Sequence, residues 1–156
     1  MRNISSPGGP PLSEQEARDL RCLVGMMIPA SVKYGIPGAD DPVIFADILK
    51  SLGRDLGEAH VALRDLAALS SGSFADLAPV RREEVATSFR EAGGEALWIL
   101  HRVVLLCYYR DDRVMRSLEM EVRPPFPEGF VIEQGDWSLL DPVRKRARLW
   151  RDPNAY

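Results

Sequence analysis

The sequence has no excess of basic residues and very little cysteine or histidine. Its 20 Lys and Arg residues are outnumbered by 23 Asp and Glu residues, and the formal net charge is -3. A protein that binds nucleic acid needs clustered positive charge to neutralise phosphates, so nucleic acid is not an expected partner. The two cysteines, Cys22 and Cys107, lie far apart and form no C-x-x-C motif. We therefore expect two reduced thiols in the core.

A long apolar run is also missing. Residues 1–12 carry one Arg and a Pro- and Gly-rich stretch, without an apolar segment that would serve as a signal peptide. We expect this segment to be disordered and the protein to be cytoplasmic. The most apolar stretch, residues 96–107, contains His101 and Arg102 and is far shorter than the roughly 20 residues that span a bilayer. It predicts a buried core helix, and no membrane insertion is expected.

Motifs that cradle nucleotides or hold metals are missing as well. The chain has neither a G-x-G-x-x-G nor a G-x-x-x-x-G-K-[ST] pattern. His60 and His101 lack the spacing that places two metal ligands on one helical face. His101 is expected to be a core histidine with one hydrogen-bonded ring nitrogen, and it lies on the opposite side of its helix from Cys107. We expect no catalytic, cofactor-binding or metal-binding residue in this chain.

The sequence does contain enough apolar residues for one core, with 46% hydrophobic and 28% charged residues in a chain of 156. Ser13 and Glu16 have capping-box spacing, and Asp41 followed by Pro42 marks another helix start. Apolar residues recur with a helical period, which predicts an all-α fold, a small bundle of about five helices. The expected helices cover residues 12–28, 42–52 and 56–67 on either side of a break or bend at Gly53, 79–91 and 95–109, followed by a short helical turn over 111–118.

Residues 121–156 differ from the helical body at residues 13–120. Five prolines interrupt this segment, and neither a helical nor a strand period is sustained. Its content of aromatic and aliphatic residues is nevertheless too high for a solvated linker. We predict a long, extended, proline-rich C-terminal arm that packs along a surface, with a partner chain covering at least half of it.

Two clusters of side chains are candidate contacts. Residues 108–113 combine two tyrosines with two arginines at the end of the apolar helix, and Tyr and Arg are enriched at contact hot spots. A solvated helix end explains the same cluster equally well. Residues 144–151 form a basic run that contains Trp150, and this run fits an acidic patch on a protein partner.

Two stretches carry distinctive motifs. The first, at residues 28–30 and 34–42, ends in Tyr-Gly-Ile-Pro-Gly-Ala-Asp-Asp-Pro. The second, at residues 107–130 and 140–144, joins a Tyr-Tyr pair, a short helix and a Pro-Pro-Phe-Pro-Glu-Gly segment, and it is the more specific of the two. Together these stretches resemble the small third subunit of gluconate 2-dehydrogenase and its relatives among sorbitol, glucose and fructose dehydrogenases.

The resemblance implies a non-catalytic helical subunit of a hetero-oligomer. Its large partner, of the glucose-methanol-choline type, would bind FAD and oxidise an alcohol or sugar hydroxyl. Members of the family often carry a twin-arginine export signal, whereas Arg81 and Arg82 are internal here and no apolar run follows them. A folding or assembly role is therefore expected in place of export. The predicted partner-binding residues are Tyr34, Pro37, Tyr108, Tyr109, Arg110, Arg113, Arg123, Pro125, Phe126, Phe130, Trp137, Arg144 and Trp150.

Three hypotheses about function follow from the sequence. The leading one is an accessory subunit that binds, stabilises and helps assemble the large flavoprotein, with the arm shaping its substrate entrance. The second is a helical ligand-binding protein or enzyme that acts alone. The third is an assembly chaperone that binds its client transiently and then releases it.

Overall fold

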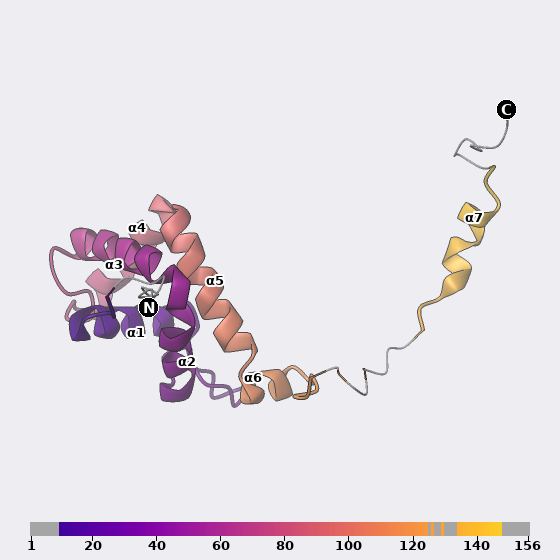
Figure 1. Cartoon of the computed structure of the whole chain (residues 1–156), viewed down its shortest axis with the longest axis horizontal. Coiled ribbons are helices and arrows are strands. Elements are labelled where there is room, and N and C mark those ends of the chain that lie inside the picture. The colour runs from indigo at the N-terminus through magenta and orange to yellow at the C-terminus, as the bar shows by residue number, and fades with distance from the viewer. Residues whose placement is uncertain (1–9, 125, 127–128, 130–133, 148–156) are drawn as a thin grey trace, which may run out of the picture. The chain divides into compact units, whose positions relative to one another are not determined.

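The computed structural model describes residues 10–124, 126, 129 and 134–147, and the chain divides into two units, Met1–Val122 and Arg123–Tyr156. Over the described residues the secondary structure is helical, apart from one isolated bridge between Ser31 and Ile36, and this confirms the predicted all-α fold. The helices of the first unit are α1 (Glu14–Met27), α2 (Pro42–Leu52), α3 (Leu56–Ser70), α4 (Pro79–Ala92), α5 (Glu95–Tyr109) and α6 (Asp112–Ser117) (Figure 1).

The helix starts follow the capping signals in the sequence. The Ser13 hydroxyl accepts from the Glu16 amide at 3.2 Å, and the Glu16 carboxylate accepts from the Ser13 amide at 2.8 Å, which completes the predicted capping box of α1. Asp41 caps α2 by accepting from the amides of Val43 and Ile44. Each of these carboxylates or hydroxyls satisfies amide groups that a helix start leaves without partners.

Gly53 breaks the helix at the point that the sequence left undecided. α2 ends at Leu52, and the chain passes through a 3-10 turn at Gly53–Asp55 before α3 begins. Gly53 has a φ of 34°, a conformation that a residue with a Cβ atom adopts only at a cost. The break allows α2 and α3 to pack separately against α5.

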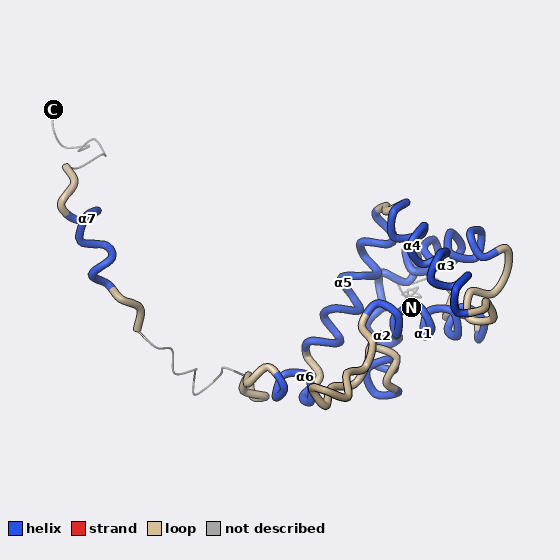
Figure 2. The backbone as a smooth tube through the Cα atoms, turned by 180° about the vertical axis from the view of Figure 1, so that it is seen from behind, coloured by secondary structure: helices blue, strands red, loops and turns tan. Residues whose placement is uncertain are grey.

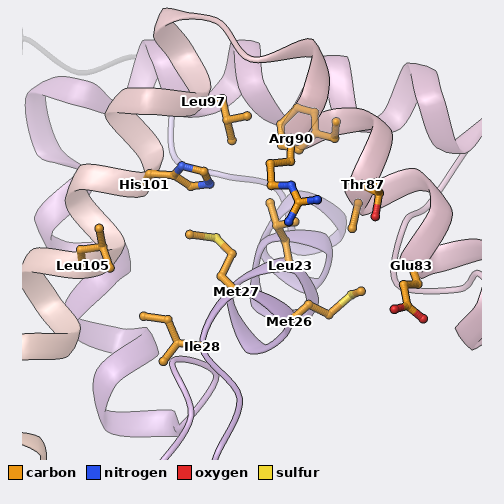
Figure 3. A pocket seen from close by; sticks show the side chains of 12 residues that line it. Leu23, Met26, Met27, Ile28, Glu83, Thr87, Arg90, Leu97, His101 and Leu105 are labelled. Atoms are coloured by element: carbon orange, nitrogen blue, oxygen red, sulfur yellow. The ribbon is translucent and has the colours of Figure 1, made fainter.

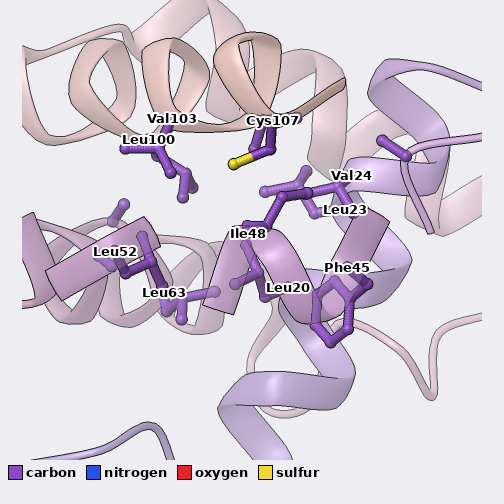
Figure 4. Close-up of a cluster of buried hydrophobic side chains, with 14 of the residues drawn as sticks. Leu20, Leu23, Val24, Phe45, Ile48, Leu52, Leu63, Leu100, Val103 and Cys107 are labelled. Atoms are coloured by element: carbon purple, nitrogen blue, oxygen red, sulfur yellow. The ribbon is translucent and has the colours of Figure 1, made fainter. Parts of the chain in front are cut away.

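The hydrophobic core lies where α5 packs against α2 and α3, with α1 closing one side (Figures 2 and 4). Burying one large aliphatic side chain stabilises a fold by about 1.5 to 3 kcal/mol, so this cluster is the main source of stability. The largest fully buried side chains are Leu20, Val24, Ile44, Ile48, Leu52, Leu66, Phe74, Leu100, Val104, Cys107 and Val114.

The polar segment between α3 and α4 contributes a core residue that its sequence does not indicate. Phe74 is completely buried, although it follows a Ser-Ser-Gly-Ser run. The segment is held by the buried carboxylate of Asp19, which accepts from the Ser73 hydroxyl at 3.0 Å and from the Ala75 amide at 2.8 Å. This anchoring fixes the segment against α1.

The second unit contains more local structure than an extended arm. A 3-10 turn at Trp137–Leu140 leads directly into the short helix α7 (Asp141–Arg144), and the Asp136 carboxylate accepts from the Ser138 amide at the start of the turn. The prediction that residues 121–156 lack helical structure is therefore wrong for this part. Asp136 supplies the cap and Pro142 is compatible with the first turn of a helix, so the local signals were present but short.

Candidate functional site

In the predicted 108–113 cluster, Arg113 makes contacts within the chain and not with solvent alone. The Arg113 guanidinium donates to Asp41 at 2.8 and 3.1 Å and to Asp111 at 3.0 Å. These carboxylates are the N-caps of α2 and α6, so one cation joins two helix starts. The hydrogen bonds from Arg113 lower the pKa of both carboxyl groups, and the carboxylates in turn raise the pKa of Arg113.

Tyr108 and Arg110 also make contacts within the first unit. Tyr108 is only 3% exposed, and its hydroxyl donates to the Pro37 carbonyl at 3.2 Å. Arg110 donates to the Asp47 carboxylate at 2.6 Å and also to the hydroxyl of Ser51. In this conformation Tyr108 has little exposed surface for a partner to contact, and Arg110 is hydrogen-bonded to two side chains of α2.

The loop at residues 29–41 is placed by these contacts and remains open at its tip. It runs beside α6 in both views of the backbone, where Tyr108 and Arg113 hold it (Figures 1 and 2). At the tip, Val32 and Tyr34 are exposed, and Lys33 lies over the Tyr34 ring. Of the predicted contacts in the first unit, Tyr34 and Tyr109 are the exposed aromatic residues, whereas Pro37 is half-buried.

The second unit presents exposed aromatic residues. Phe126 and Trp137 are exposed, and the Trp137 indole donates to Gln134 at 3.2 Å. Arg123 donates to the Gly129 carbonyl at 2.6 Å, while Arg144 pairs with Asp141 at 3.2 Å. Three further predicted contacts, Pro125, Phe130 and Trp150, lie outside the described residues.

An exposed apolar face of α5 is the main feature that the sequence reasoning missed. The predicted buried core helix is confirmed for the face of α5 that meets α2 and α3, but the prediction is wrong for the opposite face, which is exposed. On the other face Trp98 is 63% exposed, Leu106 61% and Tyr109 53%. These residues and Leu105 line a shallow groove. Trp98, Arg102, Leu105 and Tyr109 lie on one face of the helix by their spacing. The charged Arg102 on this face was the available signal that the face is exposed.

A pocket of about 470 Å³ lies between α1, α4 and α5, next to that groove (Figure 3). Its apolar wall includes Leu23, Met27 and Leu97, and its polar groups include Arg90 and His101. The groove on α5 shares His101 and Leu105 with the pocket, so the two hollows form one continuous surface.

The His101 side chain lines both the pocket and the groove. The expectation of a core histidine held by a hydrogen bond is wrong, because the ring is half-buried and makes no hydrogen bond to the residues that the structure describes. Burial lowers its pKa, which favours the neutral ring. Such a ring retains one donor and one acceptor for a bound group.

The other titratable groups serve the fold. His60 contacts the Glu16 carboxylate at 2.7 Å and the Pro10 carbonyl at 2.8 Å. Cys107 is buried, Cys22 is half-buried, and both are free thiols whose pKa is raised by burial. Within residues 10–124, 126, 129 and 134–147, no group of His, Cys, Asp and Glu side chains is arranged to hold a metal ion.

Comparison of the chain with protein-family models, with curated proteins and with solved structures finds no significant match. Among the helices that the structure describes, none is long and apolar enough to cross a membrane.

Proposed function

We propose that this chain is a non-catalytic accessory subunit, which binds, stabilises and helps assemble a large FAD-dependent alcohol or sugar oxidoreductase subunit of the glucose-methanol-choline type. The observation that carries the proposal is the exposed apolar face of α5, where Trp98, Leu106 and Tyr109 line the same groove. Contiguous apolar surface of this kind is typical of protein–protein contacts.

The proposal combines this face with the exposed residues of the two sequence motifs. Tyr34 at the loop tip, and Phe126 and Trp137 in the second unit, are exposed aromatic groups of the kind that a binding partner covers. The resemblance of the same stretches to small dehydrogenase subunits supplies the class of partner. In this account the C-terminal segment extends toward the substrate entrance of the flavoprotein.

The mechanism is stabilisation by mass action. A subunit that binds the folded flavoprotein and not its unfolded chain raises the apparent stability of that flavoprotein by an amount set by concentration and affinity. The fixed loop at residues 29–41 contributes to affinity because Arg113 and Tyr108 order it before binding, which lowers the entropy lost on association.

Co-purification tests the proposal. A tagged full-length chain is co-expressed with a large flavoprotein of the glucose-methanol-choline type from the same genome, and the eluate is measured for FAD absorbance and subunit ratio. A stoichiometric yellow complex, with no yellow colour in the chain purified alone, supports an accessory subunit. FAD in the isolated chain, or a flavoprotein that never co-elutes, would contradict it. A complex that forms and then dissociates on completion of FAD loading would instead support the chaperone hypothesis.

A further inference from the structure

The pocket between α1, α4 and α5 combines an apolar wall with the cationic side chain of Arg90. Leu23 and Met27 come from α1, Phe89 from α4 and Leu97 from α5, and these side chains surround a space of about 470 Å³. Small-molecule sites commonly fall between about 300 and 1,000 Å³ and pair an apolar wall with a few polar groups. The pocket therefore has the size and the composition of a ligand site.

Arg90 supplies the charge of this pocket. Other arginines near α5 are neutralised, because Arg102 pairs with Asp55 at 2.6 Å and Arg110 with Asp47 at 2.6 Å. Arg90 forms no hydrogen bond or ion pair with any residue that the structure describes. The acidic residue of the lining, Glu83, lies two turns earlier on α4, about 10 Å away along the helix axis.

Arg90 and His101 are polar groups that line the same pocket. In Figure 3 the His101 ring lies above Met27, and the Arg90 guanidinium lies beside Leu23. A carboxylate in this pocket would accept hydrogen bonds from Arg90, and charge-assisted bonds of this type are about twice as strong as neutral ones. A neutral His101 ring could donate a further hydrogen bond without adding charge.

We propose that this pocket binds a small amphipathic carboxylate, with its carboxylate on Arg90 and His101 and its apolar body against Leu23, Met27 and Leu97. The inference goes beyond the proposed accessory role, because it concerns a small molecule bound by this chain itself. It rests on the walls of the pocket and on the charge of Arg90, which has no ion-pair partner among the described residues, and it holds whether or not a protein partner covers the neighbouring groove.

Three probes with the same apolar body and different head groups test the proposal on the full-length chain. Octanoate, octan-1-ol and octylammonium are titrated while amide chemical shifts or calorimetric heats are recorded. Octanoate should saturate one site and bind at least about tenfold more tightly than octylammonium, since only the anion complements Arg90. Equal binding of all three probes, or no saturable binding of octanoate, would overturn the proposal.

Substitutions locate the site and separate it from the partner surface. Arg90→Gln should weaken octanoate to the level of octan-1-ol, whereas Arg81→Gln, on the same helix and paired with Glu84, should leave it unchanged. Unchanged octanoate affinity in Arg90→Gln would also overturn the proposal. Failure of octanoate binding with an intact flavoprotein complex refutes the pocket alone, and binding without any complex refutes the accessory role alone.

Discussion

Two residues on opposite faces of α5 provide a matched test of the helix orientation. Leu100 is 1% exposed within the core, whereas Trp98, two positions earlier, is 63% exposed. Leu100→Ala removes buried methyl groups and should lower the free energy of unfolding by about 2 to 5 kcal/mol. A fully buried Trp would cost about 3 to 5 kcal/mol on truncation to Ala. Only about a third of the Trp98 surface is covered, which scales this loss to about 1 to 2 kcal/mol.

The contact of Trp98 with Arg102 raises that figure by up to about 1 kcal/mol. The guanidinium carbon lies 5.8 Å from the ring centroid, and such pairs contribute about 0.5 to 1 kcal/mol at exposed sites. Urea denaturation followed by circular dichroism measures both variants, with an unchanged slope as the control for two-state behaviour. If Trp98→Ala destabilised the chain as much as Leu100→Ala, the outer face of α5 would have to be buried, and the reasoning would fail.

Three further predictions concern polar links and the second unit. The hydrogen bonds to the Pro10 carbonyl and the Glu16 carboxylate raise the pKa of His60, and both partners only accept, so the ring must donate from both nitrogens as an imidazolium. This stabilisation is complete below the unfolded pKa of about 6.5 and is lost as pH rises through the folded pKa. His60→Gln should therefore flatten the fall in melting temperature above neutral pH, and an identical profile in both proteins would refute the link. Arg113→Gln should lower the free energy of unfolding by about 1 kcal/mol, discounted because the side chain is 42% exposed, and the deficit should shrink as pH falls and Asp41 and Asp111 become protonated. A deficit measured in urea that stays constant down to acid pH would contradict this role. Trp137→Ala should weaken flavoprotein binding by about 2 kcal/mol or more, whereas Lys145→Ala should change it little, as surface plasmon resonance can measure; equal effects would show that Trp137 is not an anchor.

The helices were predictable from the sequence because their signals are local. Ser13 and Glu16, and Asp41 with Pro42, fix helix starts through bonds within three residues of each cap. Gly53 could not be resolved in the same way, since a glycine at that point permits either a bend or a break. In the structure the helix breaks at Gly53, and α2 and α3 each pack against α5. No local sequence pattern encodes this packing.

The candidate site depended on information that a single sequence holds only weakly. The apolar composition of α5 indicated burial, but which face is covered depends on how α1, α2 and α3 pack. Tyr108 and Tyr109 are adjacent and similar in sequence, yet one is in the core and the other is exposed, because successive helical residues point in directions about 100° apart. The surroundings of His101 could not be predicted either, because the pocket that it lines is formed by residues from three helices.

The most direct test of the accessory role is size-exclusion chromatography of co-expressed chains, monitored by flavin absorbance. The large flavoprotein is expressed with the full-length chain, and separately with a chain that ends at Glu121 and so retains α1 to α6. The account predicts a stable stoichiometric complex with the full-length chain, and a truncated chain that keeps its helical circular dichroism signal but binds the flavoprotein more weakly, because it retains the exposed face of α5 and loses Phe126 and Trp137. A full-length chain that elutes as a stable monomer, beside a flavoprotein that is folded and active without it, would contradict the account.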